Sequence, residues 1–289
     1  PAHNTQVNSS AASDVYKRQA QDLCGNPAVD AILVLTPMEF HCEYVIMAAK
    51  AGKHVLVEKP VASTISEIQE MLQALKDSGT KCMPGHNYIY EDSIRRAKQM
   101  IDQGKLGRIT QFYMMYNIHH ADDIRARYPG VIRQILTHHA YTMLYLAGMP
   151  KSVSCMRFST SEQVPQENVA MATVQMENGS LSHLCASFAN DDHSSDAWTC
   201  IIKVMGTKGS SRYSYRDWVI YEKNGPHSQT YFAYPETIAN ELQYFVEKVV
   251  MGDEPPLSSL EDALICQQVM EACEQSATDG KHVTLDVKK

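Results

Sequence analysis

The stretch that decides the fold is Val29–Pro60, VDAILVLTPMEFHCEYVIMAAKAGKHVLVEKP. The apolar run Ala31–Leu35 lies between turn residues and predicts a buried parallel strand. Helical spacing over Glu39–Lys50, followed by Gly52, predicts a helix, and His54–Val57 predicts a second buried strand. This order predicts a parallel sheet, in which ligands bind beyond the carboxyl ends of the strands. The residues expected at that edge are Thr36, Pro37, His41, Glu58, Lys59 and Pro60.

Composition and charge exclude several classes of protein. A chain of 289 residues predicts about two domains. The net charge of −7 and pI of about 5.9 argue against a nucleic-acid partner, which requires a basic surface. No stretch approaches the roughly twenty apolar residues that cross a bilayer, and no hydrophobic signal region follows the N-terminus. The eight cysteines form no CxxC pair, so we expect reduced, buried thiols and a cytoplasmic protein with no membrane partner.

Four further blocks follow in the chain: GHNYIYEDSIRRAKQMIDQGKLGRI (Gly85–Ile109), HHAYTMLYLAG (His138–Gly148), MGTKGS (Met205–Ser210) and EDALICQQVMEACEQSATDGK (Glu261–Lys281). Together with the opening stretch, they resemble the Gfo/Idh/MocA family of NAD(P)-dependent oxidoreductases over nearly everything after Gln19. The resemblance implies an enzyme with NAD or NADP as cofactor. The residues that it implies for cofactor binding are Thr36, Pro37 and His41, on the nicotinamide-ribose side, with Glu58, Lys59 and Pro60. It also implies hydride transfer to or from a small-molecule substrate, a sugar, polyol or related hydroxy compound.

One family feature is missing from the sequence. Family members begin with a strand–helix–strand unit that carries GxGxxG, whose glycines let the backbone approach the pyrophosphate. No GxGxxG occurs in this chain, and Pro1–Gln19 is polar with no strand pattern. We therefore expect an N-terminally truncated family member that binds cofactor weakly or not at all. Residues 1–19 would be a non-native or disordered tail, and residues 20–106 a partial dinucleotide-binding (Rossmann) domain.

After residue 107 the pattern changes from alternating strands and helices to long strands. One helix is predicted at Val131–Ala147, and two more at Pro235–Met251 and Leu260–Thr278. The predicted fold class is α/β plus α+β, with an incomplete parallel sheet followed by an open, mostly antiparallel sheet. The resemblance implies that residues 107–289 bind substrate and form a homo-oligomer through that sheet. The strands are predicted at 109–118, 152–158, 169–176, 180–189, 199–205 and 211–221.

The resemblance implies two catalytic residues. Lys59 ends a buried strand at the ligand edge, where its ammonium group would stabilise developing alkoxide charge. His138 takes the place of the family's general acid/base, and imidazole titrates near neutrality. From the residues alone, a surface lysine and a hydrogen-bonded core histidine would be the favoured interpretations.

Substrate contacts are predicted at Asn87, His120, Arg125, Gln134 and His139. Arg125 would suit a carboxylate or phosphate on the ligand. Gln134 stands where the family often has an aspartate, one turn before the histidine. A glutamine can orient the imidazole by a hydrogen bond, but it cannot stabilise an imidazolium as a carboxylate would. The polar loop also holds His119, Asp122, Asp123 and Arg127, but no HxxxH or HExxH spacing supports a metal, so none is expected.

Two alternative functions stay open at this stage. Some proteins of the same fold retain NAD and cleave glycosidic bonds by transient oxidation, which departs from the two-carboxylate mechanism of most glycosidases. A non-catalytic sensor or scaffold is the other alternative, and Gln134 and the missing phosphate-binding loop motivate it.

Overall fold

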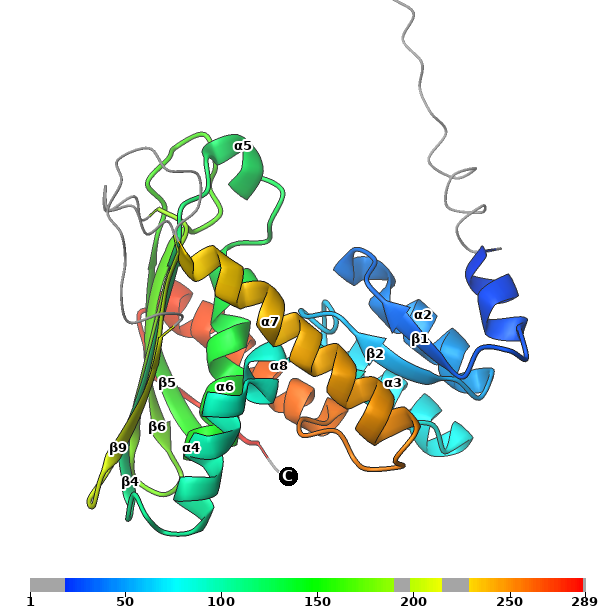
Figure 1. Cartoon of the computed structure of the whole chain (residues 1–289). Coiled ribbons are helices and arrows are strands. Elements are labelled where there is room, and N and C mark those ends of the chain that lie inside the picture. The colour runs from blue at the N-terminus through cyan, green and yellow to red at the C-terminus, as the bar shows by residue number, and fades with distance from the viewer. Residues whose placement is uncertain (1–18, 190–197, 215–228, 288–289) are drawn as a thin grey trace, which may run out of the picture.

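A computed structural model of the chain describes residues 19–189, 198–214 and 229–287. Most of the predicted tail at 1–19 lies outside these residues. Figure 1 shows a large sheet at left, a small sheet at right and helices between them. Among the described residues, no helix is both long and apolar enough to cross a membrane.

The small sheet consists of three parallel strands in the order β1-β2-β3. The strands are β1 (Ala31–Val34), β2 (His54–Val57) and β3 (Cys82–Pro84). The 3₁₀ turn η1 (Met38–Phe40) and helix α2 (His41–Lys50) connect β1 to β2, and helix α3 (Ile65–Ser78) connects β2 to β3. The strand, helix and parallel pairing predicted for this stretch are therefore confirmed.

Helix α3 begins and ends where its sequence directs. The Thr64 side chain accepts from the Glu67 N–H, and the Glu67 carboxylate accepts from the Thr64 N–H, which is a capping box. The helix ends at Gly79, whose φ of 69° is the left-handed conformation that glycine adopts without strain. The buried residues Ile68, Met71 and Ala74 turn one face of α3 toward the sheet.

The large sheet has seven strands in the order β10-β5-β6-β7-β4-β8-β9. All neighbouring pairs are antiparallel except β4 and β7, which are parallel, so the predicted open and mostly antiparallel sheet is confirmed. The strands are β4 (Ile109–Ile118), β5 (Pro150–Phe158), β6 (Val169–Met176), β7 (Leu181–Ser187), β8 (Trp198–Gly206), β9 (Ser210–Ser214) and β10 (Val283–Thr284).

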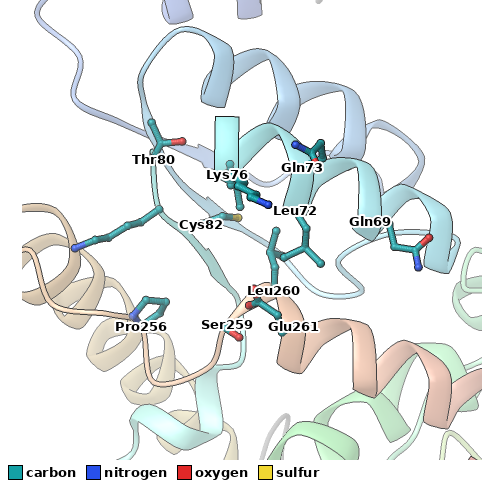
Figure 2. A pocket seen from close by; sticks show the side chains of 12 residues that line it. Gln69, Leu72, Gln73, Lys76, Thr80, Cys82, Pro256, Ser259, Leu260 and Glu261 are labelled. Atoms are coloured by element: carbon teal, nitrogen blue, oxygen red, sulfur yellow. The ribbon is translucent and has the colours of Figure 1, made fainter. Parts of the chain in front are cut away.

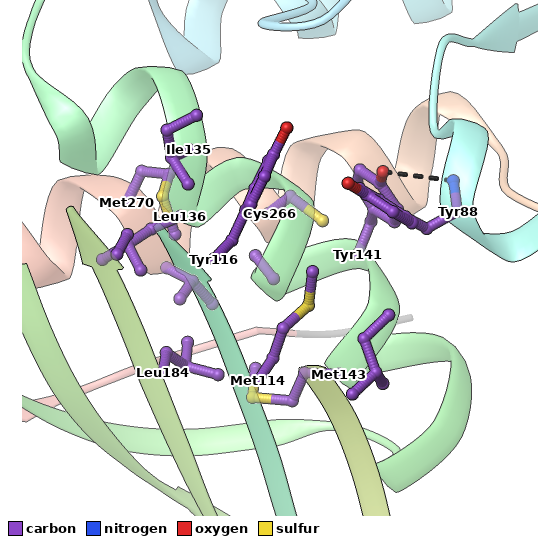
Figure 3. Close-up of a cluster of buried hydrophobic side chains, with 14 of the residues drawn as sticks. Tyr88, Met114, Tyr116, Ile135, Leu136, Tyr141, Met143, Leu184, Cys266 and Met270 are labelled. Carbon is purple, nitrogen blue, oxygen red and sulfur yellow. Dashed lines mark hydrogen bonds between the residues drawn. The ribbon is translucent and has the colours of Figure 1, made fainter. Parts of the chain in front are cut away.

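Helices α6 and α8 cover one face of the large sheet (Figure 1). Figure 3 shows the core that this packing creates, with Met114, Leu184, Met143 and Met270 pointing into one cluster. The remaining helical segments are η2 (Asn87–Tyr90), α4 (Asp92–Asp102), α5 (Asp122–Arg125), the π-helical turn η3 (Ile132–Leu136), α6 (Thr137–Ala147), α7 (Gln229–Tyr244), the π-helical turn η4 (Phe245–Val250) and α8 (Leu260–Asp279).

Helix α8 belongs to both hydrophobic cores. Its residues Cys266 and Met270 pack in the large cluster, whereas Leu260 and Ala263 pack with the strands and helices of the small sheet. Helix α8 therefore packs against elements of both sheets. This packing joins the two parts of the chain.

Two predicted elements differ from the structure. The helix predicted to begin at Pro235 is α7, which begins at Gln229, so this proline lies inside the helix and does not start it. The strand predicted at 211–221 is present as β9, which ends at Ser214, and residues 215–221 lie outside the described part. All eight cysteines are free, and all but Cys42 are buried, as the sequence predicts.

Candidate active site

The site is built first at the carboxyl edge of the small sheet. The Glu58 N–H donates to the Val34 carbonyl at 3.0 Å, and the Gly85 N–H donates to the Val57 carbonyl at 2.7 Å, so the three strand ends are tied together. A Cβ at Gly85 would lie 3.2 Å from the Glu58 Cα, which explains glycine at this turn. The Glu58 carboxylate also accepts from the Lys59 N–H, and this fixes the start of the Glu-Lys-Pro turn.

The His41 ring connects two segments at this edge of the sheet. Its Nε2 lies 2.7 Å from the Thr36 carbonyl oxygen, and its Nδ1 lies 3.0 Å from the Pro60 carbonyl oxygen. The buried ring therefore joins the end of β1 to the turn after β2. Thr36 and Pro37 are exposed beside it. A nicotinamide-side role for these residues stays a prediction, and for His41 the structure supports a positioning role through its backbone contacts.

Lys59 extends from the turn toward the helix of the other part of the chain. Its Nζ donates to the Gln134 carbonyl at 3.3 Å. Burial lowers the pKa of its ammonium group, and the neighbouring Glu58 carboxylate opposes that shift. The lysine thus places its Nζ at the turn η3, directly before helix α6.

His138 lies on α6, one turn beyond that contact, and only 2% of the residue is exposed. Burial holds its pKa well below the usual 6.5, and Lys59, His139 and His86 lower it further. The ring is neutral at physiological pH. Its Nδ1 lies 2.7 Å from the Tyr141 hydroxyl oxygen. The predicted catalytic pair therefore interacts electrostatically across the junction of the two sheets.

Tyrosine rings enclose the imidazole. The edges of Tyr88 and Tyr116 approach the His138 ring with centroids 5.3 and 5.8 Å away. Tyr141 stacks on His86 at 4.2 Å, and Figure 3 shows it beside Tyr88, whose N–H donates to the Tyr141 hydroxyl at 3.3 Å. This wall of rings excludes water from one side of the base and restrains its orientation.

Asn87, a predicted substrate contact, instead belongs to this wall. It is buried, its amide donates to the Thr237 hydroxyl at 2.5 Å, and its carbonyl oxygen accepts from the Tyr141 hydroxyl at 2.9 Å. The sequence predicted a site residue here but not its partners. Thr237 comes from α7, far along the chain, and no local pattern indicates it.

The structure directs Arg125 and His139, two predicted substrate contacts, into the protein. The Arg125 guanidinium is buried and donates to Asp122 at 2.5 Å and to the carbonyls of Gln166 and Val164 at 3.0 and 3.2 Å. The two ring nitrogens of His139 lie 3.0 Å from the Ile135 and 3.0 Å from the Cys185 carbonyl oxygens. Both side chains hold neighbouring segments together, so we assign them structural roles.

The structure gives Gln134 and His120 contacts within the protein. The Gln134 carbonyl accepts from Lys59, but the partner of the His138 Nδ1 is Tyr141 and not the glutamine. The His120 ring packs against Phe188 with centroids 4.9 Å apart, and burial lowers its pKa. Their predicted contacts with substrate stay predictions.

Glu241 is a site residue that the sequence did not indicate. It lies on the same side of α7 as Thr237, one turn later, and only 2% of it is exposed. Burial, with a smaller effect of Glu58, raises the pKa of this carboxyl well above 4.5. Its Oε1 has no hydrogen-bond partner among the described residues. Burial therefore favours the protonated, uncharged form of this carboxyl group.

The described residues fit the nicotinamide end of NAD(P). Three parallel strand ends converge there, and a cation and a neutral imidazole lie beside them, which suits a reacting hydroxyl group. The sequence holds no GxGxxG loop for the pyrophosphate. No group of three or more His, Cys, Asp or Glu side chains is placed to hold a metal ion within residues 19–189, 198–214 and 229–287.

A separate hollow of about 510 Å³ lies between α3, β3 and the start of α8 (Figure 2). Leu72, Cys82 and Leu260 line it, and Lys81 on its rim forms an ion pair with Asp253 at 2.5 Å. None of the described residues that line this hollow is a predicted site residue. We therefore do not assign it to the candidate active site.

Comparison with known families agrees with this fold. Residues 2–86 match an oxidoreductase family described as having an NAD-binding Rossmann fold, and residues 94–212 match the GFO/IDH/MocA C-terminal domain. The NAD-binding part and the C-terminal part of this oxidoreductase family are thus both matched. The chain belongs to the Gfo/Idh/MocA family.

Individual relatives differ in how much of their length is matched. The NAD-dependent scyllo-inositol 2-dehydrogenase of Bacillus subtilis is 26% identical over 95% of this chain and 83% of its own length. The 1,5-anhydro-D-fructose reductase of Ensifer adhaerens is 29% identical over 66% of this chain and 58% of its own length. A diene dehydrogenase of Comamonas testosteroni is 38% identical, but over only 24% of its own length.

Solved structures share the fold. The scyllo-inositol dehydrogenase of Lactobacillus casei, with bound NAD(H) and scyllo-inositol, superposes with a TM-score of 0.79 over 95% of this chain and 88% of its own. A probable dehydrogenase from Thermotoga maritima gives 0.81 over 98% of this chain and 90% of its own. Their identities of 22% and 20% make this likeness a statement about fold alone.

Proposed function

We propose that this protein transfers a hydride between NAD or NADP and the hydroxyl-bearing carbon of a sugar, a polyol such as an inositol, or a related hydroxy compound. The observation that carries the proposal is the approach of Lys59 to the segment that precedes His138. The Lys59 ammonium lies 3.3 Å from the Gln134 carbonyl, and it lowers the pKa of the His138 imidazole. A cation and a neutral base on opposite sides of one junction match the needs of alcohol oxidation.

The two side chains would divide the proton chemistry. When bound, NAD(P) supplies the acceptor or donor of the hydride. The Lys59 ammonium would donate a hydrogen bond to the substrate oxygen and stabilise the alkoxide that develops as the hydride leaves. The neutral His138 ring would accept the hydroxyl proton and return it in the reverse direction.

The substrate class rests on the names of the relatives. Scyllo-inositol and 1,5-anhydro-D-fructose are both cyclic polyhydroxy compounds, and dehydrogenases or reductases of both are related to this chain. A ring that carries several hydroxyl groups would suit a site rich in tyrosine, amide and carboxyl groups. We therefore propose a cyclic polyol or sugar as the first class to test.

The test is a panel of inositols and anhydrosugars with millimolar NAD or NADP, followed by absorbance of the reduced cofactor. We expect reduction with at least one substrate, and a loss of about 100-fold or more in Lys59→Met at the same cofactor concentration. Millimolar cofactor keeps the comparison valid if binding is weak, and calorimetric titration measures that binding directly. Micromolar affinity would contradict the weak binding expected from the missing GxGxxG.

The two alternatives predict different results. An NAD-dependent glycosidase would release a chromogenic aglycone without added cofactor, and the panel would show no net reduction. A sensor or scaffold would bind a ligand with no turnover, and Lys59→Met would change no rate. Reduction that depends on Lys59 would exclude both.

We further propose a homo-oligomer formed through the uncovered face of the large sheet, in a cytoplasmic protein. Met156 and Phe158 of β5 are 82% and 63% exposed, and Met171 of β6, which pairs with Met156, is 49% exposed. Leu181 of β7 is 52% exposed. An apolar group on the sheet face opposite the helices favours an interface. Analytical ultracentrifugation tests this, and a monomer at micromolar concentration would contradict it.

A further inference from the structure

We infer that Tyr141, oriented by Asn87 and Thr237, fixes the tautomer of His138 so that its Nε2 is the free, unprotonated nitrogen. This chain of hydrogen bonds runs from α7 through η2 to α6. Its catalytic consequence rests on the proposed function, whereas the tautomer itself does not. Tyr141 acts here as a positioning residue and does not contact the reacting atoms.

Thr237 determines which groups donate and which accept along this series of hydrogen bonds. Its hydroxyl lies 2.8 Å from the Tyr234 carbonyl oxygen, and a carbonyl can only accept, so the single hydroxyl proton is donated there. The Thr237 oxygen, 2.5 Å from the Asn87 amide, must then accept. This forces the NH₂ group of Asn87 toward Thr237 and leaves its carbonyl oxygen facing Tyr141.

The donors and acceptors around the Tyr141 hydroxyl can be assigned in the same way. Its hydroxyl donates its only proton to the Asn87 carbonyl oxygen at 2.9 Å, and it accepts from the Tyr88 N–H at 3.3 Å. The His138 Nδ1, 2.7 Å from the same oxygen, can therefore approach only as a donor. A neutral imidazole has one N–H, so Nε2 carries a lone pair.

The geometry holds this arrangement firmly. Tyr141 is stacked on the His86 ring with an angle of 14° between the planes, and the His86 Nδ1 lies 2.7 Å from the Ser258 hydroxyl. Tyr141, Asn87 and Thr237 are all buried, so water does not compete for the hydrogen bonds. The phenol at the third position after His138 thus takes the orienting role predicted for Gln134.

A fixed Nδ1–H tautomer leaves Nε2 ready to accept a proton from a substrate hydroxyl. A phenol accepts the Nδ1 hydrogen bond without carrying a negative charge, so it orients the ring but does not neutralise the imidazolium that forms. We therefore expect substitutions of Tyr141, Asn87 or Thr237 to lower the turnover rate more than the substrate affinity.

Nitrogen-15 NMR of the histidine-labelled full chain tests the inference without cofactor or turnover. His138, assigned by loss of its signals in His138→Gln, should show a protonated Nδ1 and a bare Nε2 at pH 7.5. Tyr141→Phe should shift His138 toward the Nε2–H form, because the acceptor for Nδ1–H is lost. Thr237→Val should do the same by freeing the Asn87 amide to rotate, and Thr237→Ser should keep the wild-type spectrum.

The outcomes separate the two proposals. A wild-type His138 with a protonated Nε2, or a spectrum unchanged in both Tyr141→Phe and Thr237→Val, would overturn the inference. If Tyr141→Phe does not fold, the contrast of Thr237→Val with Thr237→Ser decides. Where turnover is found, we expect kcat to fall about 10- to 100-fold in Tyr141→Phe with little change in KM. Absence of turnover in the wild type would count against the proposed function and leave the tautomer result standing.

Discussion

Helix α6 carries two consecutive histidines that face different parts of the molecule. His138 faces the junction with the small sheet, where its Nδ1 meets the Tyr141 hydroxyl. His139 faces β7: its Nε2 lies 3.0 Å from the Cys185 carbonyl oxygen of β7, and its Nδ1 lies 3.0 Å from the Ile135 carbonyl oxygen of η3. Burial lowers the pKa of both rings. Residue type and burial are therefore the same on the two sides, and only the hydrogen-bond partners distinguish a candidate base from a structural link.

The largest expected difference between the two sides is in catalysis. His138→Gln removes the proposed base, and we expect turnover of the substrate found in the panel to fall by about 10²- to 10⁴-fold. His139→Gln should keep kcat within about twofold, because the hydrogen bonds of this ring go to the Ile135 and Cys185 carbonyls and not to the proposed catalytic pair. Steady-state kinetics of the two variants make the comparison.

The adjacent variant is also a control for folding. His139→Gln should lower the free energy of unfolding by about 1–3 kcal/mol, because carbonyls between α6 and β7 lose a buried partner. His138→Gln should fold with a stability closer to that of the wild type. Equal losses of turnover in the two variants would remove the distinction between the two sides of α6.

A smaller effect should appear in the dependence of stability on pH. Burial lowers the pKa of His86 to about 3 and that of His139 to about 4, whereas an unfolded histidine titrates near 6.5. Between pH 6.5 and these values the unfolded chain binds protons that the folded chain does not, so stability falls as pH falls. Each ring should contribute about 1 kcal/mol per pH unit.

Urea unfolding at pH 7, 6 and 5 measures this slope above the range in which most carboxylates titrate. We expect the slope of His139→Gln to be shallower than that of the wild type by about 1 kcal/mol per pH unit. A slope equal to the wild-type value would mean that His139 is protonated in the folded protein, which its burial opposes even though the two carbonyls that contact it raise its pKa.

The strands and the edge of the small sheet were predictable because their signals are local. β2, β4 and β6 have the predicted limits, and the turn after β2 places Lys59 at the carboxyl edge as a buried strand requires. The side chains around that edge depend on contacts between distant segments. Thr237 and Asn87 are 150 positions apart, so no periodicity in the sequence could pair them.

Helix α6 shows why the sequence did not distinguish the roles of the adjacent residues His138 and His139. All of its residues from Thr137 to Met143 are buried, so no polar face tells which side meets the site. The turn before it is π-helical over Ile132–Leu136, which removes the regular spacing that the prediction for Gln134 assumed. Tyr141 was within reach of sequence reasoning, because a residue three positions after His138 lies on the same helix face.

The measurement that tests the central claim most directly is the transfer of deuterium from a carbon-deuterated inositol or sugar to NAD(P). The substrate is one that the panel identifies, and single turnover at millimolar cofactor is followed by mass spectrometry of the nicotinamide. We predict that deuterium reaches the nicotinamide in the wild type and that both Lys59→Met and His138→Gln slow the transfer by about 100-fold or more. Transfer at an unchanged rate in either folded variant, or no transfer with any substrate of the panel, would contradict the account.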